Sequence, residues 1–413
     1  MHKAFNKLFD LITGFDIAGE LQKVLKFDEM SQNQIHQTQL DKFNLLKKYA
    51  CRSAMYKNFL NKDYKSFPIV NRESLKKDFH KFLTNFRKPY SIQHSSGSTS
   101  DPISIIVSRE MLLAKRVSHQ KMLHWFGIDR EAKEFKIGGV KESMATQIYY
   151  YLKNKRYYNS FRINEDTIKR IITHYNKFKP IVLYGYPSAI FGFIQMAHKK
   201  DLKLHSPKVI ATHAENLYPE IEEKFASTFP ESSIANQYWA TESNIAVSCP
   251  QGNLHIDEDS VICETINMNE NGVGDLIITN LHSYDFPIIR YKIGDRVKLS
   301  DKLCPCGRKT KIIEYIEGRE IEFIELPDGR KINTTALYLS RYSDNILSYQ
   351  IVYIKSRGKL IFKYLPIHER RKIRQVEISK TLKEYFGLPT EFEMISKLEY
   401  TKGGKFRKLE VID

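Results

Sequence analysis

Four short segments of this 413-residue chain combine side chains that could bind a phosphorylated ligand. The first, residues 95–102 (SSGSTSDP), places hydroxyls around a glycine just before an apolar run. Backbone N–H groups and hydroxyls in such a loop can surround phosphate oxygens. A flexible surface loop would have the same composition. The segment lacks the Gly-Lys-Ser/Thr of a P-loop, so it does not support a nucleoside triphosphatase of that kind.

The second segment, residues 237–242 (QYWATE), brings an aromatic ring, a hydroxyl and a carboxylate together at the end of an expected strand. The ring of Tyr238 could stack on a purine, Thr241 could bond a phosphate, and Glu242 could hold Mg²⁺. An ordinary strand end can carry the same residues for structural reasons alone. The segment by itself does not separate these two interpretations.

The third and fourth segments supply an aspartate and a lysine next to glycines. In residues 289–296, Asp295 follows Gly294, and a turn there would present the carboxylate to two ribose hydroxyls. A plain β-turn with a solvated aspartate has the same sequence. In residues 401–407, Lys405 follows two glycines and could swing its compact charge onto a phosphate or carboxylate. A basic, frayed chain end is the alternative.

Two pairs of metal-ligand residues bracket a β-rich stretch. Cys249 and His255 are separated by five residues, and Cys304 and Cys306 by one. Both pairs lie in loops that contain glycine and proline. Three cysteines and one histidine suit a tetrahedral, closed and therefore structural zinc site. The alternative is that Cys249 and His255 are unrelated loop residues.

The elements that must position these residues follow from the apolar pattern. The first ninety residues look mostly helical, and strands then alternate with helices, which indicates a mainly parallel sheet covered on both faces. The expected strands are residues 103–107, 181–184, 208–212 and 234–238, and the expected helices are 110–126, 166–178, 187–199 and 219–228. From about residue 248 the pattern is β-rich, with expected strands at 261–266, 275–281, 288–293 and 311–316.

The last part of the chain has the makeup of a small α+β domain. Gly318 and Arg319 precede two expected hairpins, which turn at residues 328–329 and 357–358. A charged helix at 368–386, a strand at 391–395 and a polar end follow. We therefore expect an α/β protein with a large N-terminal domain, residues 1–317, and a small C-terminal domain, residues 318–413.

Composition limits the class of protein. Apolar residues make up 42% of the chain and aromatic residues 12%, which excludes a disordered tail protein. The net charge of +17 favours anionic partners without choosing among them. Five cysteines are too few for a disulfide scaffold and suit a reducing compartment. Asp10 and Asp16 interrupt any signal peptide, and the most apolar window, residues 181–197, is shorter than the roughly 20 residues that span a bilayer. These features predict a cytoplasmic protein without a transmembrane segment.

In their order and spacing, the segments resemble the motifs of the adenylate-forming enzyme superfamily, and within it the phenylacetate–CoA ligase/CapK-like branch. The resemblance extends from about residue 90 to the end of the chain. It implies mixed and parallel sheets with flanking helices, a small β-rich subdomain, and a mobile C-terminal domain. The matching segments are residues 95–102 (phosphate loop), 184–188 (Pro-Ser element), 214–217 (adenine side), 238–242 (Tyr-x-x-Thr-Glu), 287–295 (ribose motif), 318–319 (hinge) and 404–405 (lysine).

The resemblance also implies roles for individual residues. Lys405, Thr241 and Glu242 would be catalytic: Lys405 would neutralise charge between carboxylate and phosphate, Thr241 would bond the α-phosphate, and Glu242 would bind Mg²⁺. Some members of the branch carry a zinc site with similar Cys/His pairs. The residues that would hold ATP are Ser95, Ser96, Gly97, Ser98 and Thr99 at the β/γ-phosphates, Ala214, Glu215 and Tyr238 at the adenine, Asp295 at the ribose, and Arg319 beside the hinge.

The chemistry that the resemblance implies is the activation of a carboxylic acid. The acid attacks the α-phosphate of ATP to give an acyl-adenylate and pyrophosphate, and the acyl group then passes to coenzyme A or another nucleophile. CapK-like relatives suggest capsular or surface polysaccharide biosynthesis. One alternative is transfer to an amine or a sugar hydroxyl without coenzyme A. Another is a catalytically inactive or RNA-binding relative. The chain lacks the aromatic-interleaved basic motif of single-strand binders, so we expect no nucleic-acid partner.

Three positions depart from the usual motifs. Ser100 and Asp101 stand where glycine and lysine are usual, Trp239 stands where glycine is usual, and residues 320–322 replace an Asp-containing run. The acid itself has no motif. Its expected surroundings are residues 184–190, Trp239 and the segment near Gly138, whose aromatic content suggests a planar or compact acid.

Overall fold

The structure is a computed structural model that describes residues 2–84, 91–94, 104–138, 144–159, 167–319, 323–325, 331–333, 346–366, 372–396 and 409–413. Helices predominate before residue 84, as expected. The α-helices are α1 (His2–Thr13), α2 (Ile17–Phe27), α3 (Gln32–Ala50), α4 (Arg72–Lys77), α5 (Arg109–Trp125), α6 (Met144–Leu152), α7 (Ile168–Phe178), α8 (Pro187–Lys199), α9 (Pro219–Thr228) and α10 (Gln375–Phe386).

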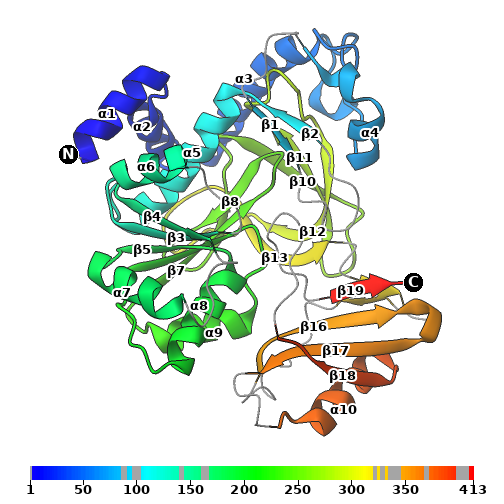
Figure 1. Ribbon diagram of the computed structural model, residues 1–413. Helices are drawn as coiled ribbons and strands as arrows, with labels where there is room; N and C mark the ends of the chain where they lie inside the picture. The colour runs from blue at the N-terminus through cyan, green and yellow to red at the C-terminus, as the bar shows by residue number, and fades with distance from the viewer. Residues whose placement is uncertain are drawn as a thin grey trace.

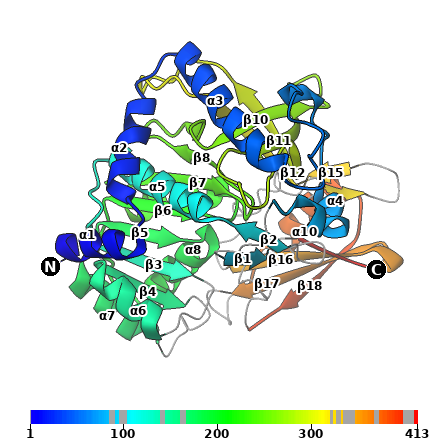
Figure 2. The ribbon, with the colours of Figure 1, turned by 90° about the horizontal axis from the view of Figure 1, so that it is seen from above.

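Five parallel strands form one half of a large sheet, in the order β7 (Ser233–Trp239), β6 (Val209–His213), β5 (Val182–Gly185), β3 (Glu134–Gly138) and β4 (Lys155–Asn159). Residues of α7, α8 and α9 cover one face, and Met122 and Leu123 of α5 pack on the other. Figure 1 shows α5 on one side of these strands and the three other helices on the opposite side, and Figure 2 shows α5 from above. Strands buried on both faces carry near-continuous apolar runs, which is why β5 and β6 could be predicted. The parallel sheet is confirmed, and α8 and α9 begin and end at the predicted residues.

Antiparallel strands continue the sheet beyond β7, to a total of eleven strands in the described part of the chain. They follow in the order β8 (Asn244–Ser248), β9 (Leu254–Ile256), β13 (Ile312–Arg319), β12 (Tyr291–Ser300), β11 (Gly274–Asn280) and β10 (Val261–Ile266). A separate antiparallel pair, β1 (Ser91–His94) and β2 (Ser104–Val107), lies beside them in Figure 1. The predicted β-rich segment is thus part of the same continuous sheet as the parallel strands.

The prediction for β12 was wrong in its bounds and in its turn. The strand begins at Tyr291 rather than at residue 288, because Arg290 takes a left-handed φ of 48° and kinks the chain there. Gly294 lies within the strand rather than in a turn, and its φ of 94° is open to glycine at little cost. Asp295 is therefore a strand residue, paired with Arg319 of β13 and only 8% exposed, not a solvated turn residue.

The C-terminal unit contains a four-stranded sheet in the order β18 (Thr390–Met394), β17 (Lys359–Pro366), β16 (Ile346–Ile354) and β19 (Leu409–Ile412), with α10 packed on it (Figure 1). The hairpin at Gly358 is confirmed. Two predictions were wrong: α10 begins at Gln375 rather than at residue 368, and the expected polar end forms β19. Pairing with the apolar strand β16, and packing of Leu409 on its core, hold that end in place.

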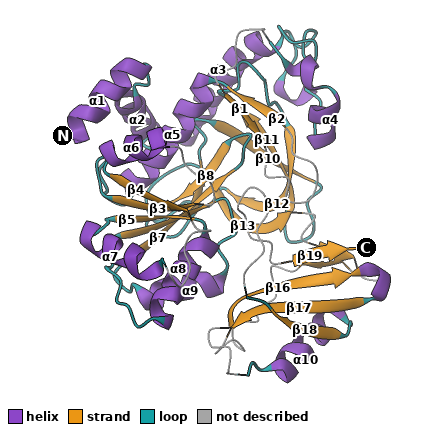
Figure 3. Ribbon diagram, in the orientation of Figure 1, coloured by secondary structure: helices purple, strands orange, loops and turns teal. Residues whose placement is uncertain are grey.

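The α/β fold class is confirmed. Figure 3 shows the strands of the large unit with helices around them, and the sheet of the C-terminal unit with α10 on one side. The hairpin strands β14 (Phe323–Glu325) and β15 (Lys331–Asn333) pair as expected, although their turn lies outside the described residues. Gly318 and Arg319 are the last two residues of β13. Among the described helices, none combines the length and the apolar character needed to cross a lipid bilayer.

Candidate functional site

Two of the predicted nucleotide-binding residues meet between strands that are distant in the sequence. Tyr238 is next to last in β7, and its hydroxyl donates a hydrogen bond to the carboxylate of Asp295 on β12. Asp295 is buried and Tyr238 is half-buried. The contact joins the parallel and antiparallel halves of the sheet at the carboxyl end of β7, the edge at which ligands of open α/β sheets bind.

The loop after β7 is held rigidly by side chains from three elements. The amide nitrogen of Asn280 donates to the carbonyl of Glu242 over 2.8 Å, and the hydroxyl of Tyr291 donates to Glu242 Oε1 over 3.2 Å. The ammonium of Lys115, on α5, donates to the carbonyls of Thr241 and Ala240 over 2.8 and 3.2 Å. Thr241 and Glu242 are therefore neighbours of the Tyr238–Asp295 contact, with backbone positions that the surrounding side chains determine.

Lys115 is a site residue that the sequence did not reveal. Burial lowers its pKa to about 8, against the opposing effect of the nearby Glu242 carboxylate. A lysine on a helix is normally a surface residue, and nothing in the spacing of α5 distinguishes this one. Its role follows only from its contacts with the backbone of the Thr241 loop in the folded protein.

The predicted adenine-side residues lie just beyond β6, at the same edge of the sheet. Ala214 has a left-handed φ of 64°, a conformation that costs a non-glycine residue about 1 kcal/mol or more and that often marks functional sites. Glu215 Oε2 accepts a hydrogen bond of 3.1 Å from the backbone N–H of Ser188, in the first turn of α8. Glu215 thus links the segment after β6 to the predicted Pro-Ser element.

Several predicted residues cannot be placed. Arg319 pairs through its backbone with Asp295, but its side chain lies outside the described atoms. The phosphate-loop residues Ser95, Ser96, Gly97, Ser98 and Thr99, and the lysine Lys405, lie outside the described residues.

The four predicted metal ligands come together. The ligand atoms of Cys249, His255, Cys304 and Cys306 all lie within 4.8 Å of one another, with 3.7 Å between the sulfurs of Cys249 and Cys304. Two thiolates bound to a tetrahedral zinc ion at about 2.3 Å lie about 3.8 Å apart, so the cluster fits this ion. His255 Nδ1 is within 2.9 Å of the Thr310 hydroxyl, which leaves Nε2, 3.3 Å from the sulfur of Cys306, to face the cluster.

Local turns and burial prepare this cluster. Gly252 and Gly307 have φ of 77° and 87°, and their N–H groups donate to the carbonyls of Cys249 and Cys304. Cys249 therefore lies on one tight turn, and Cys304 and Cys306 lie on another. Burial raises the pKa of Cys249 to about 12, so a metal ion there must displace the proton of this thiol. Burial also lowers the pKa of His255 to about 4. The imidazole is therefore neutral near pH 7, which is the form that binds metals.

A buried charge network connects α5 to the segment that follows β9. The ammonium of Lys121 is 1% exposed, pairs with the carboxylate of Asp257, and lies 3.3 Å from Asp259. The amide of Asn244 donates to Asp257 over 2.9 Å. Burial would lower the pKa of Lys121, but the two carboxylates outweigh it and raise that pKa above its usual value.

A second buried cluster, also absent from the sequence predictions, lies between α5 and the parallel strands. His119 Nδ1 is 3.0 Å from the amide nitrogen of Gln237, and His119 Nε2 is 3.7 Å from the carboxylate of Glu134. Glu134 in turn pairs with Lys155 over 2.5 Å and with Lys136 over 3.6 Å. These residues belong to α5, β7, β3 and β4, so only the fold brings them together.

Comparisons with known proteins find similarity to this chain both in sequence and in structure. No protein-family profile matches the chain. Over 360 residues it is 24% identical to Protein CapK of Staphylococcus aureus, which covers 82% of this chain and 78% of that protein.

Among solved structures, that of 2-hydroxyisobutyryl-CoA ligase in the postadenylation state superposes with a TM-score of 0.73 at 16% identity, covering 94% of this chain and 91% of the ligase. The anthranilate CoA ligase AuaEII, in complex with anthranoyl-AMP, superposes with a TM-score of 0.52 at 13% identity, over 76% of this chain and 65% of that one. These likenesses establish the fold.

Proposed function

We propose, from the sequence similarity to Protein CapK and the fold shared with 2-hydroxyisobutyryl-CoA ligase, that this chain is an ATP-dependent carboxylic acid ligase. The carboxylate of the acid attacks the α-phosphorus of ATP; the bond to the bridging oxygen breaks, and pyrophosphate leaves with its electron pair. The product is an acyl-adenylate, a mixed anhydride that a second nucleophile can attack. The observation that carries this proposal is the meeting of Tyr238 and Asp295 beside the Thr241–Glu242 loop.

The geometry supports a division of roles among these residues. The carboxylate of Asp295 is suited to accept from ribose hydroxyls, and the ring of Tyr238 to lie against the adenine. Thr241, in the loop that Lys115 holds, can donate its hydroxyl to the α-phosphate.

Glu242 fits a magnesium ion because it is a buried carboxylate whose Oε1 is held in place by the Tyr291 hydroxyl. Magnesium bound there would neutralise phosphate charge. Ser95 to Thr99 and Lys405 complete the proposal on the phosphate side, as their motifs imply. We also propose that residues 318–413 form a domain that turns after β13 and carries Lys405 to the site.

The Cys249–His255–Cys304–Cys306 cluster supports a structural zinc ion. All four positions of a tetrahedral ion are supplied by protein, and three of the four residues are buried, so no position remains for a substrate. The ion would join the loop after β8 to the loop between β12 and β13.

The second half-reaction transfers the acyl group from the adenylate to an acceptor. Coenzyme A, an amine and a sugar hydroxyl are the candidate acceptors, and the CapK-like relationship leads us to propose a cytoplasmic role in capsular or surface polysaccharide biosynthesis. Product analysis with each acceptor class distinguishes a thioester from an amide or an ester.

The ligase function is tested by ATP–pyrophosphate exchange with a panel of carboxylic acids. We expect at least one acid to support exchange in the wild type, and Lys405→Ala to lose exchange while still binding ATP in calorimetry. Absence of exchange with every acid, in protein that binds ATP, would refute the proposal.

A further inference from the structure

The His119 cluster, defined as His119, Glu134, Lys136, Gln237 and Trp239, lies under α5 and extends from Glu134, the first residue of β3, to Gln237 and Trp239 at the carboxyl end of β7. The side chains of Gln237 and Trp239 project from one face of β7, and Tyr238, between them in sequence, projects from the other toward Asp295. Both faces of β7 end at the Thr241 loop. A molecule held by Gln237 and Trp239 can therefore reach, around the end of the strand, the loop that we propose binds the α-phosphate.

Four buried polar atoms of this cluster have no hydrogen-bond partner among the residues that the structure describes. They are His119 Nε2, Glu134 Oε1, Gln237 Oε1 and Trp239 Nε1. Gln237 and Glu134 are each 2% exposed, and His119 is 9% exposed. Each such atom costs about 1–3 kcal/mol when left unpaired. Glu134 Oε1 and His119 Nε2 keep longer ionic contacts, 3.6 Å to Lys136 and 3.7 Å to the Glu134 carboxylate, so Gln237 Oε1 and Trp239 Nε1 are the two atoms that most need a ligand.

Each of these four atoms is either a hydrogen-bond donor or an acceptor, and this determines which ligand group can bind them. The Gln237 amide nitrogen donates to His119 Nδ1, so Nε2 carries the imidazole proton and is a donor. The indole N–H of Trp239 is a second donor, and its ring lies 6.4 Å from that of His119. Gln237 Oε1 and Glu134 Oε1 are acceptors. The complementary group must both donate and accept.

The charges of the cluster exclude some of the ligand groups that could bind there. Burial alone would raise the pKa of Glu134, but Lys155 and Lys136 hold it well below its usual value, and burial lowers the pKa of His119. Together with Lys155, which also pairs with Glu134, the cluster thus has two ammonium groups, one carboxylate and a neutral imidazole. Two lysines face the single carboxylate of Glu134, so the cluster would repel an ammonium group on the ligand. A carboxylate on the ligand would meet Gln237 Oε1 and Glu134 Oε1, which are both acceptors. A hydroxyl is neutral and both donates and accepts, so it avoids both conflicts.

We propose that the acid activated by this protein is a hydroxy acid, whose hydroxyl donates to Gln237 Oε1 and accepts from the Trp239 indole N–H or from His119. This inference rests on the ligase function proposed above and names its substrate class. The stacked rings of Tyr184 and His213, 4.5 Å apart, and the ammonium of Lys136, 4.4 Å over Tyr184, border the cluster and favour a compact acid.

The test uses matched sets of acids that differ only in one substituent: propionate, lactate and alanine; butyrate, 3-hydroxybutyrate and 3-aminobutyrate; benzoate, 3-hydroxybenzoate and 3-aminobenzoate. The kcat/KM of ATP–pyrophosphate exchange is measured for each acid with the full-length protein. In at least one set we expect the hydroxy acid to exceed both partners by about 100-fold, because a site with buried polar atoms rejects the analogue that leaves them unpaired.

Variants separate selection of the hydroxyl from general damage. Gln237→Met keeps the approximate shape and removes the acceptor, and Trp239→Phe keeps an aromatic ring and removes the donor. We expect each variant to reduce the hydroxy/deoxy ratio to below about tenfold. Gln195→Met makes the same change on α8, on the opposite side of the parallel strands, and should keep the wild-type ratio. A damaged fold lowers both rates together and leaves the ratio unchanged.

The outcomes are distinct. A wild-type ratio below about threefold in every set, or a preference for the amino acid, overturns the hydroxy-acid proposal while the ligase function stands. A ratio that Gln237→Met and Trp239→Phe leave unchanged also overturns it. Failure of all acids to support exchange refutes the ligase function itself, and this inference with it.

Discussion

The hydroxyl of Tyr238, at the end of the last parallel strand, donates a hydrogen bond to the carboxylate of Asp295, in the antiparallel half of the same sheet. This contact brings together a ring and a carboxylate that are 57 residues apart in the chain. This hydrogen bond links the adenine and ribose sides of the proposed nucleotide site directly.

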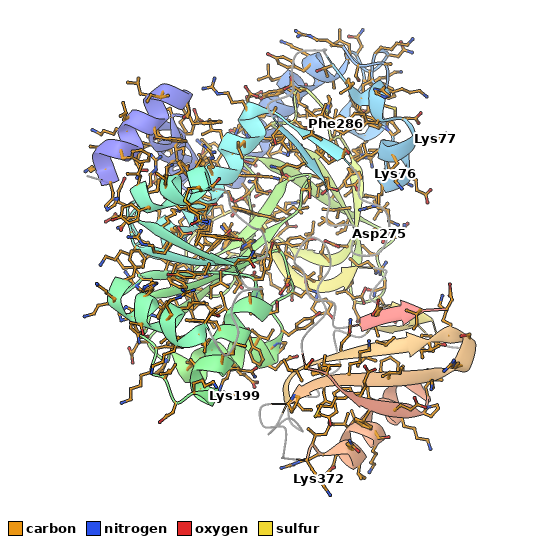
Figure 4. All side chains as sticks on the ribbon, viewed as in Figure 1. Lys76, Lys77, Lys199, Asp275, Phe286 and Lys372 are labelled. Carbon is orange, nitrogen blue, oxygen red and sulfur yellow. The ribbon has the colours of Figure 1, made fainter. Side chains whose placement is uncertain are left out.

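Replacing Asp295 with asparagine tests this unit. The amide keeps the size of the side chain but removes the charge that accepts from ribose hydroxyls, so we expect the Kd for ATP to rise about 10- to 100-fold in calorimetry. Asp275→Asn is the matched control. Asp275, labelled in Figure 4, lies on β11 and pairs with Lys292 over 3.0 Å, so its loss should leave ATP affinity unchanged. Equal weakening by both variants would contradict the ribose role.

Lys115 gives the stability of the protein a defined pH dependence. Its pKa is lowered to about 8, whereas an unfolded lysine titrates near 10.5, so the unfolded chain binds more protons between these values. The folding penalty from this residue is complete below pH 8 and is relieved as the pH rises toward 10.5. In urea unfolding from pH 7 to 10, the wild type should gain stability relative to Lys115→Met, by at most about 1.4 kcal/mol per pH unit. A constant or narrowing difference would show that Lys115 titrates normally.

The metal centre predicts about one zinc ion per purified chain. Cys249→Ser removes one of the four ligands and should lower both the zinc content, measured by mass spectrometry, and the melting temperature. Cys51→Ser, a cysteine outside the cluster, should change neither the zinc content nor the effect of a chelator. Well-folded protein that contains no zinc would exclude the site.

Replacing Lys121 should lower the free energy of unfolding more than most substitutions outside the site. Lys121→Met leaves the buried carboxylates of Asp257 and Asp259 without their cation, and losing one partner of a buried pair costs about 3–5 kcal/mol. Urea unfolding measures this loss. Lys77→Met, at the exposed lysine labelled in Figure 4, makes the same chemical change and should stay within about 0.5 kcal/mol. A small effect at Lys121 would mean that water reaches the carboxylates.

Regular apolar patterns made much of the fold predictable. The bounds of α8 and α9 followed from proline at the first helical position and from amphipathic spacing, and β5 and β6 from short apolar runs. Apolar patterns did not predict the strands that depend on distant partners. The strand β4 has no apolar run, and β19 is ordered by its pairing with β16.

The sequence by itself determined which residue types are available and, through order and spacing, named Tyr238, Glu242 and Asp295 as ligand-binding candidates and the four metal ligands as a set. Only the tertiary structure decided that Lys115 holds the Thr241 loop, and that His119, Glu134 and Gln237 share one buried cluster. The physical reason is that burial and hydrogen bonding between distant segments have no local signature. A lysine or histidine on a helix has the same pattern whether its partner is water or a carboxylate from another strand.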